Sequence, residues 1–245
     1  MPQINYPNRK TDDMNSAQMS NRTPESDVDN RIWIFGGGKF GSQAANTLIT
    51  KTPEAHITLV DKKRLTALPG DINFVRCDAL DWLIEHVATD TAGVKIIPAV
   101  PIHLAARWLC RKFLLDGFRI TPLEIPVELL MRLPNPFQLA ENCVAVSHAD
   151  FLCPPDCTAP DRVCTHTGLP RPEPLYELLH HRSRSYFTPL ILTSLQFGRG
   201  VGGYYAGDLQ KIYKTATSLA TRPLLIGTAC KCHGVIDGLV LEPAV

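Results

Sequence analysis

The chain has 245 residues, 44% of them hydrophobic, with 25 Lys and Arg against 24 Asp and Glu. This composition is that of a packed globular protein with room for one large domain or two small ones, which excludes a mostly disordered chain. A formal net charge of +1 provides no general attraction for nucleic acid or an anionic membrane, so neither is expected as a partner. There is no apolar run of about 18 residues and no secretory signal near residue 1, so we expect a soluble, cytoplasmic protein with no membrane insertion.

The first part of the chain is expected to be a disordered leader followed by an α/β domain. Residues 1–30 are rich in Asn, Asp, Ser, Thr and Pro, which predicts disorder. Beyond them, apolar runs typical of buried strands alternate with helical periodicity. The expected strands cover residues 32–35, 56–60, 73–76, 94–97 and 118–120, and the expected helices cover 40–49, 79–87 and 101–113. This alternation predicts a Rossmann-like, doubly wound parallel sheet over residues 31–142.

Residues 143–245 are expected to form a C-terminal α/β segment. It contains an aperiodic loop over residues 153–174 with six prolines. Helices are expected over 175–181 and 208–219, and strands over 189–195, 222–227 and 235–241. These strands either extend the same sheet or form a small cysteine-bearing subdomain.

A glycine-rich turn follows the first expected strand. Gly36, Gly38 and Gly41 fit the pattern G-x-G-x-x-G, with Lys39 and Phe40 at the intervening positions, and the pattern opens an expected helix. The first glycine permits a tight turn, the second lets the backbone approach a pyrophosphate, and the third lets the helix pack on the strand. Together with the free N–H groups of the helix start, this context predicts a dinucleotide site.

An acidic residue stands where the cofactor's ribose would lie. Asp61 is twenty residues beyond Gly41, at the end of the second expected strand, and such a carboxylate accepts hydrogen bonds from the ribose hydroxyls of NAD. The cations Lys62, Lys63 and Arg64 come directly after it and are suited to a 2′-phosphate. We therefore expect NAD, with NADP left open.

This arrangement resembles the Rossmann NAD(P)-binding superfamily, and more narrowly the TrkA-N-type nucleotide-binding domains of potassium-uptake regulators, over about residues 31–120. The resemblance implies that the three glycines hold the pyrophosphate and that Asp61 holds the ribose. It also implies that Asp78, after the third expected strand, lies near the adenine.

Five of the eight cysteines fall in two short irregular segments. The candidate ligands are Cys153, Cys157 and Cys164 in the proline-rich loop, and Cys230, Cys232 and His233 in a C-x-C-H sequence at a strand end. Three loop thiolates and one distant ligand suit a tetrahedral Zn²⁺ site or an iron–sulfur cluster. A redox-active pair of thiols and a set of unrelated thiols are the alternatives.

Two further residues are candidates for catalysis. His103 follows the fourth expected strand, at the edge of the sheet where a nicotinamide would lie, and is suited to general acid or base chemistry. A helix-start residue bonded to backbone is the plain alternative. Arg199 lies in a second glycine-rich stretch and is suited to holding a small anionic substrate; a flexible turn is the alternative there.

The sequence thus predicts an NAD(H)-binding oxidoreductase-like protein with a cysteine-ligated Zn²⁺ or iron–sulfur site near the cofactor. The first alternative is a non-catalytic NAD(H)-sensing regulator of TrkA-N type with a structural metal. A tetrapyrrole-pathway dehydrogenase, which also begins with a strand and a Gly-Gly-Gly turn, is a third. The sequence allows a homodimer and leaves the substrate unspecified.

Overall fold

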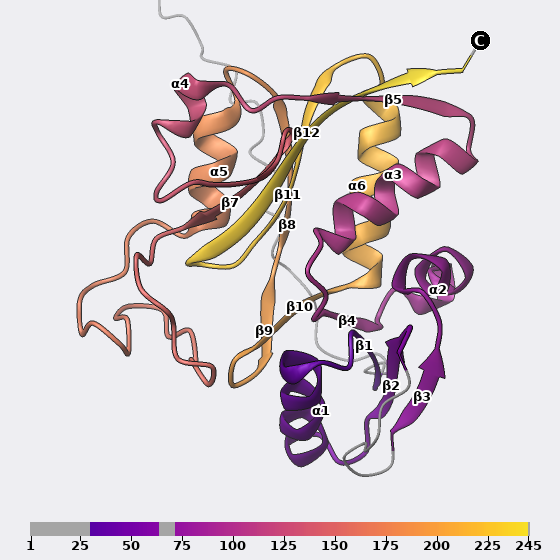
Figure 1. Ribbon diagram of the computed structural model, residues 1–245, viewed down its shortest axis with the longest axis vertical. Coiled ribbons are helices and arrows are strands. Elements are labelled where there is room, and N and C mark those ends of the chain that lie inside the picture. Colours follow the sequence, from indigo (N-terminus) through magenta and orange to yellow (C-terminus); the bar gives the residue numbers. More distant parts are fainter. Residues whose placement is uncertain (1–29, 64–71, 245) are drawn as a thin grey trace, which may run out of the picture.

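The computed structural model describes residues 30–63 and 72–244. The expected leader, apart from its last residue, and Arg64 lie outside the described residues. Within them, the chain forms two six-stranded sheets with helices packed against both, so the α/β prediction is confirmed (Figure 1). No helix in these ranges is both long and apolar enough to cross a bilayer.

The first sheet has the order β3-β2-β1-β4-β10-β9, in which the first four strands pair in parallel, β10 is antiparallel to β4, and β9 is antiparallel to β10. Its strands are β1 (Arg31–Phe35), β2 (His56–Asp61), β3 (Asn73–Arg76), β4 (Lys95–Pro98), β9 (Leu195–Gly198) and β10 (Val201–Tyr205). Alternate residues of β1 serve two cores: Ile32 and Ile34 face α1, whereas Trp33 and Phe35 face the space between the sheets. Burial of both faces explains the continuous apolar run in the sequence.

The helices of this part are α1 (Lys39–Lys51), α2 (Ala79–His86), the short η1 (Thr89–Thr91) and α3 (Leu104–Leu115). Helix α1 buries a stripe of small and apolar residues, Ala44, Ala45 and Leu48, against β1, β2, β4 and β9. Helix α2 packs against α3 and β2 on the other side.

The second sheet has the order β6-β7-β12-β11-β8, with β5 paired to β12. Its strands are β5 (Phe118–Leu123), β6 (Phe137–Ala140), β7 (Cys143–Ser147), β8 (Thr188–Thr193), β11 (Pro223–Ala229) and β12 (His233–Pro243), and its further helices are α4 (Val127–Leu130), α5 (Leu175–Ser183) and α6 (Ala206–Ser218). Leu224 and Ile226 of β11 pack toward α3 and α6, while Leu225 and Ala229 pack toward α5. The sheet is therefore the middle layer between α5 and the α3/α6 pair (Figure 1).

The two sheets interleave along the chain. The expected strand at 118–120 does not continue the parallel sheet but becomes β5, antiparallel to β12, with Ile120 opposite Leu241. The β9–β10 hairpin, which comes between two strands of the second sheet, returns to the edge of the first, with Tyr204 opposite Ile96. The C-terminal strands thus both extend the first sheet and build a second one, so the expected boundary at residue 142 does not separate the sheets.

Candidate functional site

The glycine turn between β1 and α1 is tightly packed at two positions and open at the third. Gly36 has φ of +97°, and a Cβ there would lie 2.5 Å from the carbonyl oxygen of Ala99. A Cβ on Gly41 would lie 1.7 Å from the carbonyl oxygen of Gly36, which only glycine avoids. No atom lies within 4 Å of a Cβ placed on Gly38. The turn therefore leaves free space at the one glycine that would face a pyrophosphate.

The N-terminus of α1 faces this space. Gly38 is the N-cap residue, and no described side chain caps the helix start. The first N–H groups of a helix carry partial positive charge and suit an anion. Lys39 and Phe40 follow directly, and the ring of Phe40 is 68% exposed.

Asp61 lies at the end of β2, beside the same turn. Its Oδ2 accepts a hydrogen bond from the Gly37 N–H at 2.6 Å, and its Oδ1 accepts one from the Lys63 N–H at 2.7 Å. A carboxylate has about four acceptor positions, so ribose hydroxyls can still donate to it. The two backbone bonds fix the orientation of the carboxylate.

Asp78 has a structural role at the start of α2. Its Oδ1 accepts hydrogen bonds from the N–H groups of Leu80 at 2.7 Å and Asp81 at 3.1 Å, and its Oδ2 lies 2.7 Å from Lys62 Nζ. Burial opposes ionisation of the carboxyl, but the hydrogen bonds from Lys62 and from these backbone groups outweigh it and hold its pKa below the usual value. The cation of Lys62 is occupied by this ion pair.

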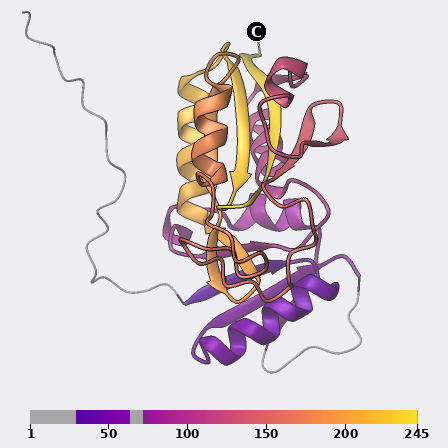
Figure 2. The same ribbon diagram turned by 90° about the vertical axis from the view of Figure 1, so that its left-hand side faces the viewer.

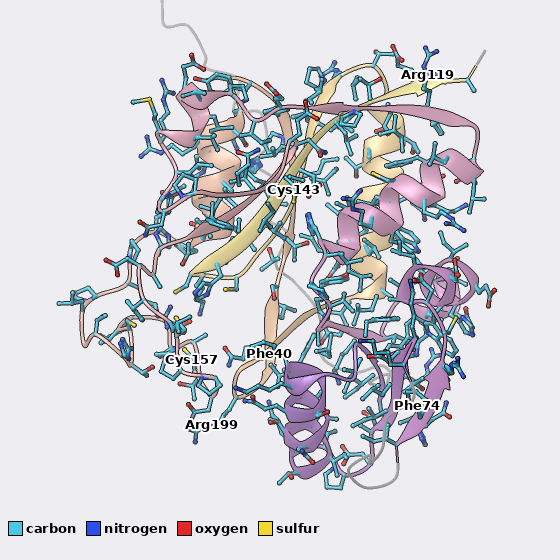
Figure 3. All side chains as sticks on the ribbon, in the orientation of Figure 1. Phe40, Phe74, Arg119, Cys143, Cys157 and Arg199 are labelled. Atoms are coloured by element: carbon cyan, nitrogen blue, oxygen red, sulfur yellow. The ribbon has the colours of Figure 1, made fainter. Side chains whose placement is uncertain are left out.

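A pocket of about 640 Å³ lies between the proline-rich loop, the turn before β12 and the first sheet. We call it the thiol pocket, because it is lined by every cysteine of the two predicted segments. Phe40 of the glycine turn also lines it. The predicted ligands in its wall are Cys153, Cys157, Cys164, Cys230, Cys232 and His233. Figure 2 shows the loop next to α1, and Figure 3 shows Cys157 and Phe40 in the same region. The fold thus brings together segments more than 60 residues apart in the chain.

His233 and Arg171 are the direct partners of these thiols. His233 Nε2 lies 3.4 Å from Cys153 Sγ, and its Nδ1 lies 3.9 Å from Cys230 Sγ. The guanidinium of Arg171 donates to Cys232 Sγ. Its Nε is buried and has no hydrogen-bond partner among the described residues. Arg171 carries no signal in the sequence pattern, because its cation meets the thiols only through the folded loop.

The pKa values of the thiols reflect their mutual proximity. Burial raises the pKa of Cys153 above the usual value, and repulsion from the thiolates of Cys157, Cys232 and Cys164 adds to this. The pKa of Cys164 is lowered instead, because backbone and hydroxyl hydrogen bonds from Thr167 favour its thiolate. Four thiols are therefore electrostatically coupled within one pocket.

The thiols do not, however, converge on one point. Among residues 30–63 and 72–244, no three His, Cys, Asp or Glu side chains are arranged to hold a metal ion. The donor set suits Zn²⁺ or an iron–sulfur cluster by its chemistry, since thiolate and imidazole are the ligands that these centres prefer.

The proline-rich loop is tied to the first sheet. Gln43 of α1 donates a hydrogen bond to the Pro155 carbonyl at 2.9 Å, and the Gly200 N–H donates to the Cys157 carbonyl at 2.9 Å. Arg199 makes an ion pair with Asp156 of the loop at 2.7 Å. The predicted anion-binding guanidinium therefore anchors the loop, and its partner, 43 residues away in the chain, could not be read from the pattern.

The remaining cysteines lie apart from this pocket. Burial, followed by the charge of Asp237, raises the pKa of Cys110 to about 11 and that of Cys143 to about 12. Cys143 lies in the second sheet, well away from Cys157 (Figure 3). These thiols are protonated and unreactive at neutral pH.

His103 lies at the N-cap of α3, between the sheets rather than in the thiol pocket. Its side chain is buried, with Nδ1 2.5 Å from Asp237 Oδ2 and Nε2 2.9 Å from Thr228 Oγ1. Neither partner of His103 could be read from the sequence. They lie more than 120 residues away, and a single Asp or Thr in a strand gives no local signal of its contacts.

Comparisons with known proteins place the chain in a family. The family AF_1314_C, described as "Uncharacterized protein, C-terminal domain", matches residues 105–242, more than half of the chain. An "Uncharacterized protein" of Archaeoglobus fulgidus is 28% identical over 221 residues, which cover 84% of this chain and 97% of that protein. No solved structure matches. The family match begins in α3 and runs through the proline-rich loop to β12, and the chain belongs to this family.

Proposed function

We propose that the chain is an NAD(H)-binding oxidoreductase-like protein with a Rossmann-type nucleotide site and a cysteine-ligated centre beside it. The parallel order β3-β2-β1-β4, with a glycine turn between β1 and α1, supports the nucleotide half of the proposal. The open space at Gly38 would admit the pyrophosphate, and the carboxylate of Asp61 would accept hydrogen bonds from the ribose.

The observation that carries the proposal is the shared pocket. Phe40, in the glycine turn, and the cysteines of both segments line one cavity of about 640 Å³. That volume suits a small molecule or part of a cofactor, and its wall combines apolar groups with a few reactive ones. A dinucleotide seated on the turn would therefore have the thiols beside it.

The ligands of the centre would be Cys153, Cys157 and Cys164, completed by Cys230, Cys232 or His233. When bound there, an iron–sulfur cluster would supply single-electron transfer, and Zn²⁺ would supply Lewis acidity. The protein's own contribution is to hold the loop against α1 and to place a guanidinium at Cys232. Arg171 would compensate negative charge on the thiolates or on an anionic substrate, a role that the sequence suggested for Arg199.

The nucleotide half is tested with Gly38→Ala. The residue has φ of −69° and nothing within 4 Å of a new Cβ, so the variant should fold normally while its methyl group fills the space for the pyrophosphate. We expect NAD⁺ affinity, measured by calorimetry, to fall at least about tenfold, or 1.4 kcal/mol. Asn46→Ala, on the exposed face of α1, is the matched control. Equal affinity in both variants would contradict the nucleotide site.

The thiol half is tested by anaerobic purification, an absorption spectrum and analysis for iron, zinc and sulfide. We expect a bound metal in the unaltered chain, its loss in Cys153→Ser, and its retention in Cys77→Ser, which lies outside the pocket. Metal-free protein after anaerobic purification would overturn the proposal of a cysteine-ligated centre. NAD(H) binding with a change of assembly and no turnover would favour the regulatory sensor over the oxidoreductase.

A further inference from the structure

A second, smaller cavity lies between the two sheets. Its volume is about 140 Å³, and it shares no lining residue with the thiol pocket. Its wall is formed by Pro98, Ile102, His103, Leu104, Ala105, Tyr204, Thr228 and Val235. An apolar cavity of similar size in another protein holds a six-carbon ring, so this space suits a molecule of about four to six non-hydrogen atoms.

Three side chains form a relay at this cavity. His103 and Asp237 are only 7% and 5% exposed. The imidazole of His103 lies between the carboxylate of Asp237, at 2.5 Å, and the hydroxyl of Thr228, at 2.9 Å. In the tautomer with the proton on Nδ1, the imidazole donates a hydrogen bond to Asp237 Oδ2, and its Nε2 accepts a hydrogen bond from the hydroxyl of Thr228. This is the arrangement by which proteins move a proton to or from a hydroxyl group.

Tyr204 supplies an independent sign of a ligand. Its side chain is 1% exposed and lines the cavity, and its hydroxyl has no hydrogen-bond partner among the described residues. Buried hydroxyl groups are nearly always paired, so one without a partner beside a cavity calls for a bound polar atom. Burial raises the pKa of Tyr204 above its usual value, so the group is a hydrogen-bond donor at neutral pH.

The charges around the cavity select the ligand class. The lining contains no Lys, Arg, Asp or Glu, and the nearest charge behind His103 is the carboxylate of Asp237. The thiols of Cys110 and Cys143, which lie near Asp237, stay protonated, and Arg107 acts on both of them from a distance. An anion would be repelled by Asp237, whereas a neutral oxygen would find two hydroxyl groups.

We propose that this cavity binds a small neutral alcohol or carbonyl compound, with Tyr204 and Thr228 on its oxygen and His103 exchanging its proton. In the oxidation, the alcohol gives its O–H proton to Thr228 Oγ while Thr228 passes its own proton to His103 Nε2. His103 then holds this proton as an imidazolium paired with Asp237. A bound NAD⁺ would supply the acceptor for the C–H hydride, so that the products would be a carbonyl compound and NADH. The hydride acceptor rests on the proposed function; the binding site does not.

One segment of the chain runs from the glycine turn to the cavity. The segment from Ala99 to His103 links the turn to the cavity, since the Ala99 carbonyl lies beside Gly36 and Ile102 and His103 line the cavity wall. A cofactor on the turn would thus meet the same segment that carries the proton acceptor.

Binding is tested on the full chain with 2-propanol and acetone as probes. The imidazole nitrogens of His103 are followed by NMR after histidine labelling and assigned with His103→Gln. We expect saturable shifts at His103, weakened at least about tenfold in Tyr204→Phe and in Thr228→Val. Tyr213→Phe, which removes a hydroxyl bonded to Asp116 elsewhere, should have no effect. Shifts that both cavity variants leave unchanged, or equal binding of acetate, would overturn the site.

The proton step is tested by NADH formation from 2-propanol. Asp237 is a positioning residue, so Asp237→Asn should lower kcat about a hundredfold with little change in KM, because an amide no longer fixes the imidazole tautomer. Protein that binds NAD⁺ and 2-propanol but forms no NADH would overturn the redox step. Protein that does not bind NAD⁺ would overturn the proposed function and leave the NMR result standing.

Discussion

Gly41 and Gly38 belong to one turn but have different reasons to be glycine. A Cβ at Gly41 would collide with backbone at 1.7 Å, so Gly41→Ala must move the helix start away from β1. We expect a loss of about 3 kcal/mol in the free energy of unfolding, measured by urea denaturation, because the obstacle cannot rotate away. The opposite result, an unaltered midpoint, would mean that the turn is looser than described.

The carboxylate of Asp78 is already bonded within the protein, to the start of α2 and to Lys62. Replacing Asp78 with Ala removes the N-cap of α2 and should cost about 1 kcal/mol of stability at neutral pH. Because the folded pKa lies below the ordinary carboxyl value, this contribution is present above that value and is lost as pH falls through the folded pKa. Denaturation curves of the two proteins should therefore converge in acid. A constant difference at every pH would assign the effect to packing instead.

At the scale of elements, local pattern predicted where strands and helices lie but not what they pair with. The apolar run at 32–35 became β1, and the helix expected over 40–49 became α1, because burial and period are properties of the segment itself. Strand β5 has the same kind of signal, yet it pairs with β12, about 120 residues later. The cysteine spacing in two irregular segments indicated a common site for the thiols. The contact of Cys232 with Arg171 and that of the proline-rich loop with α1 depend on tertiary packing.

Two side chains that hold the proline-rich loop, Gln43 of α1 and Arg199, give a prediction about its mobility. In the double variant Gln43→Ala, Arg199→Ala, we expect faster cleavage within residues 150–170 by a nonspecific protease, because two side-chain tethers are removed and the Gly200 N–H bond to the Cys157 carbonyl remains. The free energy of global unfolding should change by less than about 1 kcal/mol, as is usual for exposed ion pairs. Arg111→Ala, which breaks another exposed pair, is the control. Unchanged cleavage would show that the remaining contacts suffice to hold the loop.

At the scale of the molecule, the interleaved sheets make the two parts dependent on each other. A fragment of residues 30–142 would lack the β9–β10 hairpin that pairs with β4 and would leave β5 without β12. We expect this fragment to show no cooperative unfolding transition by circular dichroism, whereas the full chain should unfold in one transition. A cooperative fragment would show that the parallel strands suffice for folding.

Three separate passages of the chain cross from one sheet to the other: α3 into β5, β8 into β9, and β10 through α6 into β11. A single hinge cannot serve three crossings, since bending at one would strain the other two. The relative motion open to the two sheets is a small sliding of one against the other, in which α1 and the proline-rich loop move together. The walls that the sheets give to the thiol pocket are therefore in position before a molecule enters, and the ordering entropy in its binding free energy comes from the proline-rich loop alone.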